Sequence, residues 1–256
     1  MLQTIAKDFI RMKFEKTDGI IGALLTGSAS IGYTDALSDI DLEIISTEDL
    51  YRKAGETCGS EQFGGVDVWW EWITLEELEN ALKDWKDDVD LWVYSRSKIL
   101  YDPKHKIKNL LAKYRQYPRK VWPEKLFLYW YFATANAPYD SGKAIQRNDL
   151  PLAQLYLTQA TEYYTALIFI LNHSFVPYRK WRLRELGKLA YKPENYEESM
   201  LKILTVRGWT KKEFEDKQRI VNELAIVLEK KLVEAGISEE KVKNPWKFKV
   251  TYVPRT

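Results

Sequence analysis

The sequence has little of the chemistry on which several protein classes depend. Among its 256 residues there is one cysteine, Cys58, and there are only two histidines, His105 and His173. A single cysteine excludes a disulfide framework or a cysteine-rich metal site within the chain. The histidines stand 68 positions apart, which is not a zinc-ligand spacing. Neither disulfide nor structural zinc chemistry is therefore the basis of this fold.

Long apolar runs and a strong net charge are also missing. No run approaches the ~18 residues of a membrane span, and the N-terminus lacks the apolar core of a secretory signal. The net charge of +2 provides no basic surface of the kind that long nucleic acids require. Hydrophobic residues make up 45% and charged residues 30%, as in an ordinary globular protein. We expect a cytoplasmic protein that neither spans a membrane nor binds long nucleic acid.

Acidic residues with metal-binding character stand in one segment near the N-terminus. Residues 20–45, IIGALLTGSASIGYTDALSDIDLEII, predict an apolar strand over 20–25, a polar loop and a second strand carrying Asp39 and Asp41. Two positions apart on a strand, these carboxylates should share one face at about 6–7 Å. Paired carboxylate oxygens suit Mg²⁺, which takes further ligands from water and substrate phosphates.

A turn at Gly27-Ser28 lies between the two predicted strands. Glycine lets the backbone approach a ligand closely, and successive N–H groups in a turn can hold an anion. Ser28 adds a hydroxyl donor. Because Gly27 precedes Asp39 by only 12 positions, one segment offers both a phosphate-binding turn and a metal-binding pair. This combination is what the transfer of a nucleotide phosphate requires.

The pattern of Gly27-Ser28 followed by Asp39-Ile40-Asp41 resembles the signature of the DNA polymerase beta-like nucleotidyltransferase superfamily. In layout the chain is similar to small bacterial members with a C-terminal helical domain, including aminoglycoside and lincosamide adenylyltransferases. The resemblance implies transfer of a nucleoside monophosphate to a hydroxyl of a small-molecule acceptor. The donor would be ATP, which supplies AMP, or another nucleoside triphosphate. It also implies that Asp39 and Asp41 hold two Mg²⁺ ions and that Gly27 and Ser28 bind the phosphates.

The resemblance further implies a third carboxylate on a neighbouring strand, as metal ligand or general base. Residues 66–73, VDVWWEWI, predict a third strand on which Asp67 and Glu71 share a face. Asp67 is the first choice, as a metal ligand, and Glu71 is the competing general base. The alternative that both face water stays open, because sheets with one solvated face are common.

The remaining patterns predict an α+β fold in which a small mixed-sheet domain precedes an α-helical, bundle-like domain. We expect the catalytic domain over 1–102 and the helical, substrate-binding domain over 120–256. Other predicted segments are a helix over 2–16, a loop over 54–65, a helix after Thr74 with a Thr74–Glu77 capping box, a strand over 99–101, helices over 123–134, 150–171 with an Asp149 cap, 181–189 and 214–236, and an extended tail over 244–256.

Two basic residues flank the predicted central helix. Arg147 precedes it and Lys180 follows it, and the resemblance implies that this region faces the catalytic cleft. Either residue could neutralise triphosphate charge, or both could simply serve helix dipoles. Two other functions also stay open: nucleotidyl transfer to a protein or a tRNA end, and nucleotide binding without catalysis. The intact Asp39–Asp41 pair argues against the last of these.

Overall fold

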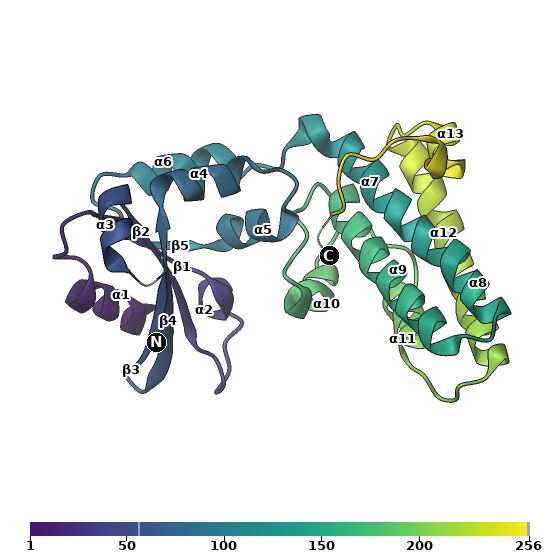
Figure 1. The fold of residues 1–256 in the computed structure, drawn as a ribbon, viewed down its shortest axis with the longest axis horizontal. Helices are drawn as coiled ribbons and strands as arrows, with labels where there is room; N and C mark the ends of the chain where they lie inside the picture. The colour runs from purple at the N-terminus through teal and green to yellow at the C-terminus, as the bar shows by residue number, and fades with distance from the viewer. Residues whose placement is uncertain (56, 255–256) are drawn as a thin grey trace. The chain divides into compact units, whose positions relative to one another are not determined.

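The computed structural model describes residues 1–55 and 57–254. The chain divides into two compact units, Met1–Gln116 and Tyr117–Thr256 (Figure 1). Within the described residues, no helix is both long enough and apolar enough to cross a membrane. The fold is α+β, with a mixed sheet in the first unit and helices in the second.

The first unit is built on a five-stranded sheet of order β3-β4-β2-β1-β5. β2 and β4 are parallel, and the other neighbouring strands are antiparallel. Its elements are α1 (Leu2–Lys13), β1 (Ile20–Leu25), α2 (Gly27–Ile31), β2 (Ile40–Ser46), α3 (Glu48–Ala54), β3 (Cys58–Phe63), β4 (Val66–Thr74), α4 (Leu75–Lys83), α5 (Asp88–Arg96), β5 (Lys98–Tyr101) and α6 (Lys106–Tyr114).

Alternation along the strands gives each face of this sheet its own apolar cluster. Ile40, Leu42 and Ile44 of β2 are buried with Phe9 of α1 on one face. Ile45 is buried on the other face, with residues of α4 and α6. Asp41 and Glu43 alternate with the first set of β2 residues and therefore point toward the face that carries Ile45.

The capping box predicted at the start of α4 is confirmed. The Glu77 amide donates to the Thr74 hydroxyl, and the Thr74 amide donates to the Glu77 carboxylate. The expected first domain, 1–102, stops before α6. Ile107 and Leu111 of α6 are nevertheless buried in the same cluster as Leu24 and Ile45, so α6 belongs to the first unit.

The second unit packs around α9 (Leu150–Leu171), whose buried residues lie on every side of the helix. Its Asp149 cap is confirmed, because the Asp149 carboxylate accepts from the Leu152 amide at 3.2 Å. The other elements are η1 (Arg119–Val121), α7 (Trp122–Thr134), η2 (Ala135–Asp140), α8 (Ser141–Gln146), η3 (Arg179–Trp181), α10 (Arg182–Leu186), α11 (Tyr196–Leu204), α12 (Lys211–Glu234), α13 (Glu239–Lys243) and η4 (Pro245–Lys247).

Three local predictions were wrong. The expected turn at Gly27-Ser28 is the first turn of the short helix α2. The expected loop over 54–65 contains the edge strand β3, although Glu56 of that segment lies outside the described residues. The tail has no strand over 244–254: η4 is followed by irregular chain, and Phe248 packs edge-on against Phe127 at 6.0 Å. Residues 255–256 lie outside the described residues.

Candidate functional site

The end of β1 and the start of β2 bring Gly27 against Asp41. The Thr26 amide donates to the main-chain oxygen of Asp41 at 2.9 Å, which continues the pairing of the two strands. A Cβ added to Gly27 would lie 1.8 Å from Oδ2 of Asp41, and the φ of Gly27 is +59°. Only glycine fits this position, because any side chain would meet the carboxylate and strain the backbone. The Asp41 carboxylate therefore lies directly against the turn that begins α2.

Ser28 follows in the first turn of α2 and is only 6% exposed. Its carbonyl accepts from the Tyr33 amide at 3.1 Å, and the Ser30 hydroxyl donates to the Gly27 carbonyl at 2.9 Å. These bonds hold the chain after Gly27 in a compact turn. The predicted phosphate-binding pair is thus part of an ordered segment beside Asp41.

Asp39 and Asp41 have different surroundings. Asp41 is in β2 and half-buried, whereas Asp39 is exposed and precedes Ile40, the first residue of the strand. The strand alternation used to place both on one face therefore applies to Asp41 alone. Asp41 is therefore fixed by the pairing of β2, whereas Asp39 lies in the loop just before the strand begins.

The parallel pairing of β2 with β4 places further side chains beside this pair. Asp41 is paired with Trp69, and Glu43 is paired with Glu71. Paired residues in neighbouring strands share a face. The Trp69 side chain is 46% exposed, which is high for so large an apolar group. Trp69 therefore offers a flat aromatic surface beside Asp41.

The two candidates for the third carboxylate lie on either side of Trp69 along β4. The Asp67 carboxylate accepts a hydrogen bond from the side-chain amide Nε2 of Gln62 in the edge strand, and Glu71 is exposed. Asp67 precedes Val68, the partner of Ile40, as Asp39 precedes Ile40. Asp67 therefore lies next to the end of the β2–β4 pairing at which Asp39 enters β2. Over residues 1–55 and 57–254, however, no three His, Cys, Asp or Glu side chains are grouped so as to hold a metal ion.

Glu43 is a buried carboxyl two residues beyond Asp41. It is 7% exposed, and its Oε2 makes no hydrogen bond within the described part of the chain. Burial raises the pKa of Glu43 to about 8, and the charges of Glu71 and Asp90 act in the same direction. A hydrogen bond with Tyr94 of α5 partly opposes this rise. Glu43 is therefore protonated at neutral pH, which limits the negative charge beside the site.

This protonation makes stability depend on pH. The pKa of Glu43 is 4.5 when unperturbed and about 8 in the folded chain, so the folded state binds the extra proton between these values. Its contribution is complete below pH 4.5 and is lost as the pH rises through 8. We expect the contribution of Glu43 to the free energy of unfolding of metal-free protein to fall by on the order of 5 kcal/mol across this window, and Glu43→Gln to flatten the slope.

Chemical denaturation in EDTA at pH 5 and pH 9 measures this effect. Glu48→Gln, at a glutamate whose side chain is 51% exposed, is the matched control and should keep the wild-type slope. Equal slopes in Glu43→Gln and wild-type protein would show that Glu43 does not hold this proton.

The two predicted basic residues lie in the second unit and in different parts of it. Arg147 is exposed at the C-terminal end of α8, just before α9 begins. Lys180 is exposed in η3, and its neighbour Arg179 bonds Glu162 of α9 at 3.0 Å. Glu162 lies about 18 Å along the helix from Leu150. Figure 1 shows α8 and α10, which follows η3, beside different parts of α9. The unit does not bring Arg147 and Lys180 together.

The fold of this chain is similar to that of a protein of known structure. The structure resembles the crystal structure of a nucleotidyltransferase-like protein from Exiguobacterium sibiricum 255-15, with a TM-score of 0.54 and 12% sequence identity. The match covers 94% of this chain and 79% of that one. Residues 87–182 match a family described as a domain of unknown function (DUF4037). No curated protein matches the sequence. The fold of this chain is thus similar to that of a nucleotidyltransferase-like protein.

Proposed function

We propose that this protein is a metal-dependent nucleotidyltransferase that transfers AMP from ATP to a hydroxyl of a small-molecule acceptor and releases pyrophosphate. One observation carries the proposal: the backbone of Gly27 lies so close to Oδ2 of Asp41 that a Cβ would reach it at 1.8 Å. The turn at Gly27, which suits a phosphate, therefore lies directly beside the Asp41 carboxylate, which suits a cation. The nucleotidyltransferase-like fold of the solved relative supports the same reaction class.

The residues present fit Mg²⁺ as the resident ions. Asp39 and Asp41 offer only carboxylate oxygens, and Mg²⁺ is commonly held by one or two carboxylates with substrate phosphates completing its shell. When bound, the ions neutralise charge that develops on the transferring phosphate and the leaving group.

The chain's own groups bind and orient the substrates. The backbone at Gly27 and the Ser28 hydroxyl would hold the β- and γ-phosphates, because N–H and O–H donors suit phosphate oxygens. The exposed Trp69 side chain provides a stacking face for a flat ring beside Asp41. We propose an aminoglycoside- or lincosamide-like acceptor, whose hydroxyl proton is taken by Glu71 if Asp67 is a metal ligand.

Two substitutions on β4 separate the roles of its carboxylates. If Asp67 is a ligand, Asp67→Asn should weaken metal binding together with turnover, because one oxygen donor loses its charge. If Glu71 is the base, Glu71→Gln should lower turnover, leave metal and ATP affinity intact, and flatten the acid limb of the pH–rate profile. Steady-state kinetics with parallel Mg²⁺ titrations measure both. Wild-type behaviour of both variants would place the third group elsewhere.

The reaction is tested by following label from ATP. The protein is incubated with Mg²⁺ and pooled aminoglycosides, lincosamides, proteins or tRNA, with the label on either the α- or the γ-phosphate. We expect label from α-labelled ATP alone to enter the small-molecule fraction, with one pyrophosphate released per transfer. Transfer of label from γ-labelled ATP to an acceptor would show that the protein is a kinase. Label in the protein or tRNA fraction would show that the acceptor is a protein or tRNA and not a small molecule.

A further inference from the structure

The second unit contains a cavity of about 650 Å³ that is independent of the site on the sheet. It is formed by α11, α12 and the segment 205–210 that joins them. All three belong to Tyr117–Thr256, so the cavity is complete within one unit. Its volume falls in the range of roughly 300–1,000 Å³ that is typical of small-molecule sites.

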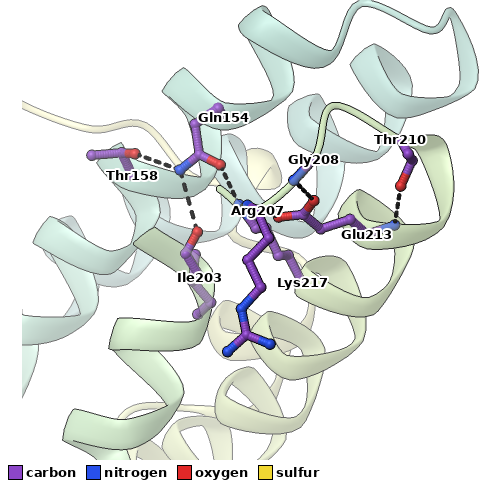
Figure 2. Close-up of polar contacts among 8 residues, drawn as sticks. All are labelled: Gln154, Thr158, Ile203, Arg207, Gly208, Thr210, Glu213 and Lys217. Atoms are coloured by element: carbon purple, nitrogen blue, oxygen red, sulfur yellow. Dashed lines mark hydrogen bonds and ion pairs between the residues drawn. The ribbon is translucent and has the colours of Figure 1, made fainter. Parts of the chain in front are cut away.

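A buried lysine anchors the inner side of this cavity. The Lys217 side chain is 3% exposed, its Nζ donates to Oε1 of Gln154 at 2.7 Å, and it lies 3.7 Å from the Glu213 carboxylate (Figure 2). Glu213 in turn accepts from the main-chain amides of Arg207 at 2.9 Å and Gly208 at 2.7 Å. These bonds hold the segment before α12 against the helix, because one carboxylate of α12 accepts from two main-chain amides of that segment.

The charged side chains around the cavity leave one positive charge uncompensated. Four cations and three carboxylates line it. Lys202 is paired with Glu198 at 2.7 Å, and Lys212 is paired with Asp216 at 3.0 Å. With Lys217 beside Glu213, the remaining cation is Arg207.

The guanidinium of Arg207 has no hydrogen-bond or ion-pair partner among residues 1–55 and 57–254. In Figure 2 the Arg207 side chain extends away from Glu213, and no dashed line reaches its guanidinium. A planar guanidinium with free donors is suited to a carboxylate or a phosphate, which it can bind through two parallel hydrogen bonds.

Apolar side chains line the same cavity. Leu201 of α11 is 58% exposed, and Ile220 of α12 lines the cavity with it. An occupant therefore needs an apolar body as well as an anionic group. The single excess charge matches a carboxylate better than a phosphomonoester, which carries about −1.5 to −2 at neutral pH.

We propose that this cavity binds a small organic carboxylate, with the carboxylate on the Arg207 guanidinium and an apolar body against Leu201 and Ile220. The proposal requires no step of the nucleotidyl-transfer reaction. It assigns the second unit a ligand site of its own.

Equilibrium binding of simple probes to the full chain tests the proposal. Hexanoate, hexyl phosphate, hexanol and hexylamine are titrated by calorimetry, and the contacted residues are mapped by NMR. We expect saturable binding of hexanoate in preference to the other three. Arg207→Ala should weaken hexanoate binding at least ~10-fold, because a charge-assisted hydrogen bond is lost, and Arg207→Lys should retain part of it.

Arg119→Ala is the matched control, because Arg119 is an exposed arginine of the same unit that does not line the cavity. It should bind hexanoate as the wild type does. The proposal is overturned by no saturable hexanoate binding, by equal affinity for hexanol, by tighter binding of hexyl phosphate, or by equal weakening in the two alanine variants. Because the readout is binding, failure of nucleotidyl transfer would not affect it.

Discussion

Asp41→Asn should lower turnover by at least ~10³-fold while the fold is retained, comparable to the loss of charge-stabilising groups in other transfer sites. The side chain keeps its shape, so it can still lie against Gly27, but it loses the charge that a divalent cation requires. In the absence of metal we expect thermal stability to stay unchanged or to rise, because repulsion between Asp39 and Asp41 is relieved. Steady-state transfer rates and melting in EDTA measure the two effects.

Asp49→Asn is the control for this substitution. Asp49 is an exposed aspartate in the first turn of α3, within the same unit. It should leave turnover unchanged. Full activity in Asp41→Asn, or an equal loss in Asp49→Asn, would remove Asp41 from the metal site.

Gly27→Ala should both destabilise the protein and lower its turnover. The added Cβ would meet Oδ2 of Asp41 at 1.8 Å, so either the carboxylate or the turn must move. Overpacking of this kind costs about 1–3 kcal/mol. The φ of +59° adds roughly 1 kcal/mol for a residue with a side chain. Since a 1 Å displacement of a catalytic group can cost ~10²-fold, we expect a loss of turnover of that order.

Gly32→Ala separates the two causes. Gly32 ends α2 with a φ of +76°, and a Cβ there would meet nothing within 4 Å. This variant carries the backbone strain without the collision, so it should be destabilised by roughly 1 kcal/mol and keep its turnover. Denaturant unfolding and kinetics compare the pair. Equal turnover in the two alanine variants would mean that the contact between Gly27 and Asp41 does not position the carboxylate.

The sequence predicted those elements whose signals are local. The strand over 20–25 coincides with β1, and the helix over 150–171 coincides with α9, because uninterrupted apolar patterns and Asp149 mark them. The Thr74–Glu77 capping box is likewise a local pattern, and both of its hydrogen bonds are present. Such elements are stabilised largely by contacts that their own residues specify.

Elements that depend on distant partners were missed. β3 is polar and glycine-containing, and it is a strand because it pairs with β4 at the edge of the sheet. A Cβ at Gly59 would lie 2.4 Å from the Trp70 ring, so this glycine makes room for a side chain of the neighbouring strand. α5 was also not predicted, but here a local signal existed: the Asp87 carboxylate is a helix cap that accepts from the Asp90 amide at 3.2 Å.

Only part of the candidate site has a local signal in the sequence. Gly27 and Asp41 follow a local motif, and the structure brings them into direct proximity. Trp69 and Glu43 join the site only through the parallel register of β2 with β4 and through the contact of Glu43 with Tyr94 of α5. Neither relation is visible in a local pattern, because each joins segments that are separated in the chain.

The central claim is that Gly27, Asp39 and Asp41 form a site for a metal-bound nucleoside triphosphate. Its most direct measurement is calorimetric titration of wild-type and Asp41→Asn protein with non-hydrolysable ATP, GTP, CTP and UTP analogues, with Mg²⁺ and with EDTA. We expect saturable, Mg²⁺-dependent binding of the ATP analogue to the wild type and a loss of that dependence in Asp41→Asn. Binding of none of the four analogues, or equal Mg²⁺-dependent binding by both proteins, would contradict it.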